Sequence, residues 1–250
     1  MIRQSFVFLE GVGNGKEALI RKQGIQDWDA FLKAEKLKGI SDQKKQKHNH
    51  TIRRASKALS DGASSFFCMR LPAAEMWRIY GHFRDECVFL DIETSGVGSH
   101  AYITVLGLFD GFDTKTMIRG VNLDIEAARS VLKEYSMIVT FNGSAFDIPF
   151  IKKRYPDLLP RVPCWDLRHS CARVGLKGGL KHIEKQLGIR RQNEIIERMH
   201  GGDAITLWRM YRGSGDPHYL ELLVQYNEED VINLKKIADT VYARLMNGFQ

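Results

Sequence analysis

The sequence predicts an α/β fold in which helices flank a mixed five-stranded sheet, preceded by a small helical and basic N-terminal region. Two observations carry this prediction. Between residues 86 and 120, three strand-like runs follow one another with short connections, which favour antiparallel neighbours. After them come a helical run, a strand-like run, a second helical run and a fifth strand-like run, and this order is typical of α/β proteins.

Each expected strand is an apolar or alternating run bounded by turn residues. In chain order the five runs read ECVFLDIETSG, AYITVLGLFDG, FDTKTMIRG, SMIVTFN and VPCWDL. The segments LDIEAARSVLKEY and DIPFIKKRY have helical spacing, and the remainder, from GGLKHIEKQLG to VYARLMNGF, is expected to be helical with glycine breaks.

We expect two regions, residues 1–80 and residues 84–250. The first opens with a glycine-containing helical pair in which Gly24 ends one helix and Asp27 caps the next. This start resembles half of a helix-hairpin-helix, although a plain capped helical hairpin fits equally well. Residues 33–60 are polar and basic, which indicates an exposed helix or a mobile linker. The aromatic-rich stretch from residue 64 is expected to anchor this region to the rest of the chain.

The basic charge is confined to the N-terminal third. Residues 1–80 hold 15 Lys and Arg against 8 Asp and Glu, whereas residues 81–250 hold 22 of each. The whole net charge of +7 therefore lies in residues 1–80. A basic patch attracts polyphosphates by counterion release, so nucleic acid is a natural partner. A solvated surface that serves only solubility is the alternative.

Membrane and secreted classes are not supported by the composition. No stretch approaches the roughly 20 apolar residues that a bilayer-spanning helix needs. The apolar part of the N-terminus is too short for a signal peptide. The 4 cysteines form no CxxC pair, so neither a zinc ribbon nor a disulfide framework is indicated. We expect a reduced, cytoplasmic protein without a membrane partner.

Four acidic residues lie within, or at the end of, apolar runs. They are Asp91 and Glu93 in the first strand, Asp147 after the fourth strand and Asp230 in a C-terminal helical segment. Transfer of an ionised group from water to a low dielectric costs roughly several kcal/mol unless the group is paired or bound to metal. Because no Lys or Arg partner is evident, the sequence indicates divalent cations, and all-oxygen ligands favour Mg²⁺ or Mn²⁺.

The spacing of these residues allows them to meet at one sheet edge. Asp91 and Glu93 share one face of a strand, and Tyr226 and Asp230 share one face of a helix. If strands one and four are parallel, Asp147 follows at the same edge. Each feature has an ordinary alternative: an acidic pair on a strand occurs by chance, Asp147 fits a helix N-cap, and Tyr226 with Asp230 fits a surface pair. Only their joint occurrence in this order favours a site.

Three segments carry a resemblance to a known family. FLDIETSG, NGSAFD and YNEED are similar to the three exonuclease motifs of the DEDD superfamily, which has a ribonuclease-H-like fold. The third motif resembles the tyrosine form (DEDDy), because a histidine form would place His where Gln225 stands. GLKHIEKQLGI, GGDAITLWRMY and the segment from Gly11 to Trp28 further resemble the YprB-type subgroup.

The resemblance implies a two-metal 3′→5′ exonuclease that releases 5′-mononucleotides from a single-stranded 3′ end. Asp91, Glu93, Asp147 and Asp230 would hold two Mg²⁺ or Mn²⁺ ions, and Tyr226 would position the attacking water. Thr94 and Asn142 would contact the terminal nucleotide. Asp166, after the fifth strand, is expected to cap a helix rather than act as a fifth ligand.

Other functions stay open at this point. The prediction favours DNA over RNA as substrate, although no motif fixes the sugar. A non-catalytic nucleic-acid-binding module, recruited to a helicase-type or repair partner, is the alternative from a different class. A structure-selective endonuclease with the same metals is a third possibility.

Overall fold

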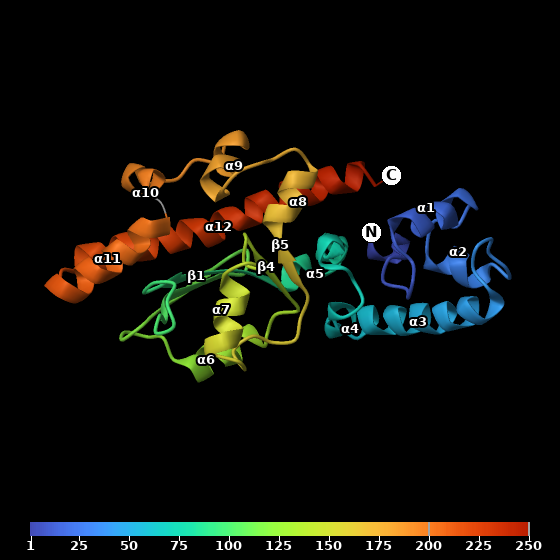
Figure 1. Ribbon diagram of the computed structural model, residues 1–250, viewed down its shortest axis with the longest axis horizontal. Helices are drawn as coiled ribbons and strands as arrows, with labels where there is room; N and C mark the ends of the chain where they lie inside the picture. Colours follow the sequence, from blue (N-terminus) through green and yellow to red (C-terminus); the bar gives the residue numbers. More distant parts are fainter. Residues whose placement is uncertain (200, 250) are drawn as a thin grey trace.

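The computed structural model describes residues 1–199 and 201–249 (Figure 1). Its sheet has five strands in the order β3-β2-β1-β4-β5, so the predicted mixed sheet is confirmed. Their bounds are β1 (Cys87–Thr94), β2 (Ile103–Phe109), β3 (Thr114–Ile118), β4 (Met137–Thr140) and β5 (Cys164–Asp166). Each strand lies within the run that predicts it.

The strand pairings determine which residues lie at the same edge of the sheet. β1 is antiparallel to β2, with Asp91 opposite Gly107, and parallel to β4, with Phe89 opposite Val139. β2 and β3 are antiparallel, and β4 and β5 are parallel. The carboxyl ends of β1 and β4 therefore lie side by side, as the sequence predicts, and the loop after β4 opens next to the acids of β1.

Helices cover both faces of this sheet (Figure 1). Side chains alternate along β1, so Val88 and Leu90 pack with α6 and α7, whereas Phe89 packs in the other core with the long helix α12. The helices after β3 are α6 (Ile125–Leu132), α7 (Asp147–Arg154), α8 (Leu167–Arg173), α9 (Leu180–Gln186), α10 (Glu194–Arg198), α11 (Gly201–Ser214) and α12 (Pro217–Asn247).

The N-terminal region is helical, as predicted. It contains α1 (Asn14–Lys22), α2 (Trp28–Lys33), α3 (Asp42–Ser60), α4 (Ser65–Cys68) and α5 (Trp77–Phe83), with short 3-10 helices at Ile2–Gln4, Ala73–Glu75 and Arg84–Glu86. Gly24 adopts φ 84° just after α1, and the Asp27 side chain caps α2 by accepting from the amide of Ala30. Both predicted helix boundaries are confirmed.

The aromatic-rich stretch anchors this region to the sheet, as expected. The ring of Tyr80 lies 4.9 Å from that of Trp165 on β5, and its hydroxyl donates to Asp239 on α12 at 2.8 Å. Trp77 contacts the ring of Tyr242 in α12. One apolar core runs without a break from the N-terminal helices to the α12 face of the sheet. The division into residues 1–80 and 84–250 stays a prediction.

Residues 33–60 do not form a linker. Most of this segment is the 19-residue helix α3, capped by Ser41, which accepts from the amide of Lys44. Its apolar side buries Ile52, Ala55 and Leu59 in the N-terminal core. Of the two alternatives for this segment, the helix is confirmed and the mobile linker is wrong, because the few apolar residues of the segment recur on one helix face. In the described part of the chain, no helix combines the length and the apolar character required to span a bilayer.

Candidate active site

The two acidic side chains of β1 point towards α12. Asp91 and Glu93 alternate with Leu90 and Ile92, so they face the same side of the sheet as Phe89. α12 crosses that side and brings Asp230 against them. One carboxylate oxygen from each of Asp91, Glu93 and Asp230 lies within 4.8 Å of the other two. Three of the four acids predicted from the sequence thus converge.

The fourth acid, Asp147, enters from the neighbouring strand. It is the first residue of α7, and its Oδ1 accepts a hydrogen bond of 3.2 Å from the amide of Ile92 in β1. Phe146 occupies the N-cap position, so the alternative of Asp147 as a helix N-cap does not hold. Asp147 stands outside the three-carboxylate group but lines the same cavity.

That cavity has a volume of about 610 Å³ and is lined by every residue predicted from the sequence to bind metal or substrate. Tyr226 lies one helical turn before Asp230 on α12, and both side chains are buried and line the cavity, so the alternative of a surface pair does not hold. Thr94 and Asn142 form part of the wall beside Phe141, Phe146 and the exposed Val97. We refer to this space as the acidic cavity.

Asn142 is held in an unusual backbone conformation. It is the one described residue other than glycine with a positive φ, at 62°. Its backbone amide donates to Asp166 at 2.8 Å, and its side-chain oxygen accepts from Arg168 at 2.7 Å. Asp166 also caps α8 by accepting from the amide of Arg168, so its predicted role as a helix cap is confirmed. The loop after β4 is thereby fixed against β5.

One expectation about the acids is wrong: Asp230 has a cationic partner. The guanidinium of Arg191, whose side chain is 1% exposed, donates to Asp230 and also to both oxygens of Glu184 at 2.9 Å. Asn233 donates to Glu184 at 3.1 Å. Arg191 lies outside every predicted motif, in a segment between two short helices, so no local pattern marks it.

Confinement of the four acids raises their pKa values. Removal from water is the largest cause for Asp91, followed by repulsion from Asp147, Glu93 and Asp230, and its pKa lies well above the ordinary value. The pKa of Glu93 is raised for similar reasons. Removal from water raises the pKa of Asp147 to about 6, and that of Asp230 to about 6 despite Arg191. Without cations, the cavity therefore favours protonated acids.

The donor set fits divalent cations. It consists of carboxylate oxygens, which hard cations prefer. Binding of a cation also relieves the electrostatic repulsion between the confined carboxylates. The three converging carboxylates would hold one ion, and Asp147 is placed to complete a second site with Asp91. Arg191 pairs with Glu184 and Asp230 but, among the described residues, not with Asp91 or Glu93, so the charge of these two acids is left for a cation.

A pH dependence follows from the raised pKa values. An acid that binds its proton more tightly in the folded state stabilises the fold at low pH, and this contribution is lost as the pH rises from its unfolded to its folded pKa. In EDTA, we expect the free energy of unfolding of the native protein to fall relative to that of Asp147→Asn by up to about 3 kcal/mol as the pH rises from about 4 to about 6. Urea denaturation across this range measures it. Parallel curves for the two proteins would contradict the shift.

Asn227 is a second residue that sequence reasoning missed. Its side-chain amide donates to Asp91 Oδ2 at 2.9 Å, and the side chain is fully buried against β2. A Cβ atom added at Gly107, opposite Asp91 on β2, would lie 1.9 Å from Asn227 Oδ1. The absence of a side chain at Gly107 therefore leaves the space that the Asn227 side chain occupies when it donates to Asp91.

Gly107→Ala tests this arrangement. The added methyl group must displace Asn227 and with it the hydrogen bond to Asp91, so we expect a loss of at least about 2 kcal/mol in unfolding free energy, as for overpacked cores. Urea denaturation measures the loss. Gly213→Ala is the matched control, because its Cβ meets nothing within 4 Å in a helix. If both variants are equally stable, Gly107 is not a packing constraint.

The arrangement of strands, helices and acids agrees with comparisons to known proteins. A family profile described as RNase_H superfamily (RNase_H_2) matches residues 88–242. The chain belongs to the ribonuclease H superfamily. A curated relative of this chain is "Uncharacterized protein YprB" of Bacillus subtilis (strain 168), which is 30% identical over 174 residues. The match covers 62% of this chain and 41% of YprB, so the chain spans less than half of that relative's length.

A solved DNA polymerase structure contains a fold similar to that of this chain. The family B DNA polymerase from the archaeon Pyrobaculum calidifontis superposes with a TM-score of 0.50 at 17% identity, over 62% of this chain and 24% of the polymerase. RNase D of Escherichia coli, an exoribonuclease involved in structured RNA processing, gives a TM-score of 0.47 at 16% identity, over 69% of this chain and 43% of RNase D. At these identities the likeness concerns the fold alone.

Proposed function

We propose that this protein is a two-metal-dependent 3′→5′ exonuclease that removes 5′-mononucleotides from single-stranded nucleic acid, with DNA as the preferred substrate. The observation that carries the proposal is the convergence of Asp91, Glu93 and Asp230 within 4.8 Å, in the cavity that also holds Asp147 and Tyr226. Membership of the ribonuclease H superfamily supports it.

Divalent cations, when bound, would supply the charge compensation of the reaction. Two ions, when bound, would stabilise the attacking and leaving oxygens of an in-line displacement at phosphorus. Asp91, Glu93, Asp147 and Asp230 would hold them. Asn227 keeps the Asp91 carboxylate in one orientation, and Arg191 does the same for Asp230.

Tyr226 acts in this proposal as a hydrogen-bond donor. Removal from water raises its pKa, and the acids Asp230, Glu93 and Asp91 raise it further. Its hydroxyl therefore keeps its proton at neutral pH and orients the attacking water or a phosphate oxygen rather than accepting a proton. Val97, Phe141 and Phe146 give the cavity the apolar surface on which a terminal base can stack.

The test uses a single strand of DNA labelled at its 5′ end. We expect progressive shortening in Mn²⁺ or Mg²⁺, release of 5′-mononucleotides, and no reaction in EDTA. A circular single strand should stay intact, because it has no 3′ end, and cutting of the circle would indicate an endonuclease. Binding of the strand without cleavage in any ion would instead favour the non-catalytic module that serves a helicase-type partner. Parallel reactions on RNA of the same sequence test the preference for DNA.

A further inference from the structure

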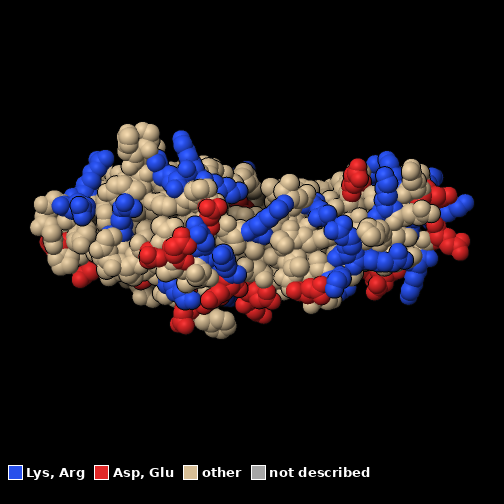
Figure 2. Space-filling view, turned by 90° about the horizontal axis from the view of Figure 1, so that it is seen from below, with Lys and Arg blue, Asp and Glu red and all other residues tan. Residues whose placement is uncertain are grey.

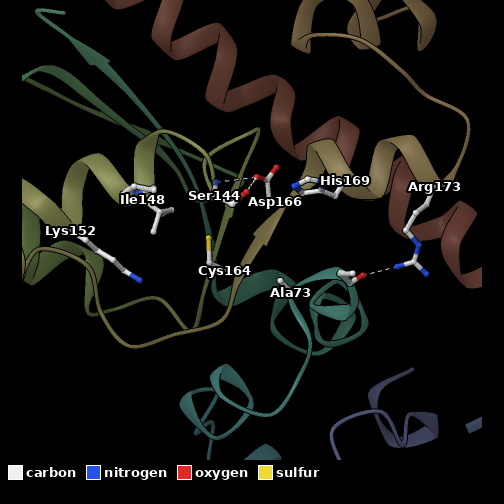
Figure 3. A pocket seen from close by; sticks show the side chains of 10 residues that line it. Ala73, Ser144, Ile148, Lys152, Cys164, Asp166, His169 and Arg173 are labelled. Atoms are coloured by element: carbon white, nitrogen blue, oxygen red, sulfur yellow. Dashed lines mark hydrogen bonds between the residues drawn. The ribbon is translucent and has the colours of Figure 1, made fainter. Parts of the chain in front are cut away.

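A row of three cavities leads away from the acidic cavity to the N-terminal helices. The first has a volume of about 850 Å³ and lies between α7, α8 and the 3-10 helix Ala73–Glu75 (Figure 3). Residues of the loop after β4 separate it from the acidic cavity: Asn142 lines the acidic cavity, and Ser144 lines the first cavity of the row. Arg168 and His169, at the start of α8, are divided between the two in the same way.

The row continues through shared residues. Lys152 and Cys164 line both the first cavity and a second of about 410 Å³. Arg161 lines both that second cavity and a third of about 450 Å³, which lies against α3 and α4. Each cavity thus opens next to the following one, from the acidic edge of the sheet to the C-terminal part of α3.

The walls of this row are cationic. Lys152 extends from α7 on one side of the first cavity and Arg173 from α8 on the other (Figure 3). Arg161 lines the second cavity, and Arg54, Lys57 and Arg70 line the third. We call these six residues the basic track. Lys and Arg side chains also lie across the middle of the molecule and over its N-terminal end in the view from below (Figure 2).

Much of this charge is not neutralised. Lys57 pairs with Asp61 at 2.9 Å, and Arg173 pairs with Glu75 at 3.3 Å. Within the described chain, Arg54, Lys152 and Arg161 take part in no ion pair. All three are exposed.

Besides Asp61 and Glu75, Asp166 lies near these cations, and it is already engaged by neighbouring donors. Its carboxylate accepts from the amides of Asn142, Ser144 and Arg168 and from the Ser144 hydroxyl. Arg54, Lys152 and Arg161 therefore face solvent with no acid paired to them in the described chain, which is the charge pattern that a polyphosphate backbone matches.

Apolar surface accompanies the cations. In the third cavity, the half-buried ring of Phe66 lies 4.1 Å from the guanidinium of Arg70 and 5.8 Å from that of Arg54. Met69, which is 77% exposed, lines the second cavity. Alternation of cationic and apolar contacts is typical of grooves that hold single-stranded nucleic acid, because phosphates and bases are contacted in turn.

We propose that the basic track holds the single strand whose 3′ end lies in the acidic cavity, with its 5′ portion running past α7 and α8 to α3 and α4. The inference rests on the proposed exonuclease function and assigns the N-terminal region a role in substrate binding. The continuous row of cavities and the unpaired cations carry it. Short strands that end within the acidic cavity would not reach the track.

The test compares two triple variants with equal charge changes. The track variant combines Arg54→Gln, Lys152→Gln and Arg161→Gln. The control combines Lys33→Gln, Lys36→Gln and Lys38→Gln, which are exposed residues of the same N-terminal region that line none of these cavities. Binding of a fluorescent single strand of about 20 nucleotides is measured by anisotropy in EDTA over a range of salt concentrations.

For the track variant we expect weaker binding and a salt dependence of log K that is flatter by about 2, since each phosphate contact on a single strand contributes about 0.7. The control variant should bind like the native protein. Equal losses in both variants would overturn the track in favour of unspecific charge, and so would unchanged binding in the track variant.

Cleavage of a trinucleotide in Mn²⁺ separates this inference from the proposed function. The track variant should cut the trinucleotide as fast as the native protein and the longer strand more slowly at low strand concentration. Equal slowing on both substrates would overturn the track. If no protein cuts either substrate, the exonuclease proposal fails, while the binding comparison still decides whether a strand lies along the track.

Discussion

Replacing Asp91 by Asn is expected to lower the rate of phosphodiester cleavage at least about a thousandfold. Asp91 is the acid whose pKa is raised by all three others, and under the proposed function it would bind both ions. Loss of several kcal/mol of charge stabilisation at the reacting phosphate corresponds to a factor of this size. Single-turnover cleavage of a 5′-labelled strand in Mn²⁺ measures it.

The fold should survive this change, because Asn keeps an oxygen that can accept from Asn227 and removes one of the repelling charges. We expect an unfolding free energy in EDTA at least equal to that of the native protein at pH 8. Asp113→Asn, on an exposed turn between β2 and β3, is the matched control and should cleave normally. Full activity in Asp91→Asn would refute the assignment of the site.

Replacing Arg191 by Met is expected to cost about 3 to 5 kcal/mol of unfolding free energy at pH 8. The change leaves Glu184 and Asp230 buried without their cation, and removal of one partner from a buried ion pair carries a penalty of this size. Urea denaturation in EDTA measures the loss. Arg190→Met provides the control, because that neighbouring side chain is exposed and should tolerate the change.

The penalty should shrink as the pH falls. Arg191 lowers the pKa of Asp230, so Asp230 takes up its proton more readily once Arg191 is absent, and at pH 5 the uncompensated charge is smaller and the variant comes closer to the native stability. Addition of Mn²⁺ at pH 8 should recover part of the loss, since a cation replaces part of the missing charge on Asp230. Equal penalties at pH 5 and pH 8 would show that Arg191 acts by packing alone.

The sheet and the position of the strand acids were predictable because both depend on local patterns. The alternation in β1 places Asp91 and Glu93 on one face, and the spacing of Tyr226 and Asp230 places them on one helix face. The parallel pairing of β1 with β4, which the sequence left as a condition, brings Asp147 to the same edge. Period and chain order are sufficient for these inferences.

The groups that support the acids were not predictable, because they meet them only in the folded chain. Arg191 reaches Asp230 across 39 positions, and Asn227 reaches Asp91 across 136. Arg191 lies at no spacing that a strand or a helix would mark, and Asn227, although it belongs to YNEED, has no local spacing to Asp91. The helix α3 was also ambiguous in sequence, since its few apolar residues are spread thinly among cations. Long-range packing decides such cases rather than local preference.

Mn²⁺ binding, observed by electron paramagnetic resonance, tests most directly whether the four acids bind divalent cations for catalysis. The native protein at neutral pH should bind two Mn²⁺ ions close enough to couple magnetically, roughly 3.5–4 Å apart. Asp91→Asn should abolish the coupling, and Asp113→Asn should leave it unchanged. Uncoupled or absent Mn²⁺ in the native protein, or coupling that persists in Asp91→Asn, would contradict the claim.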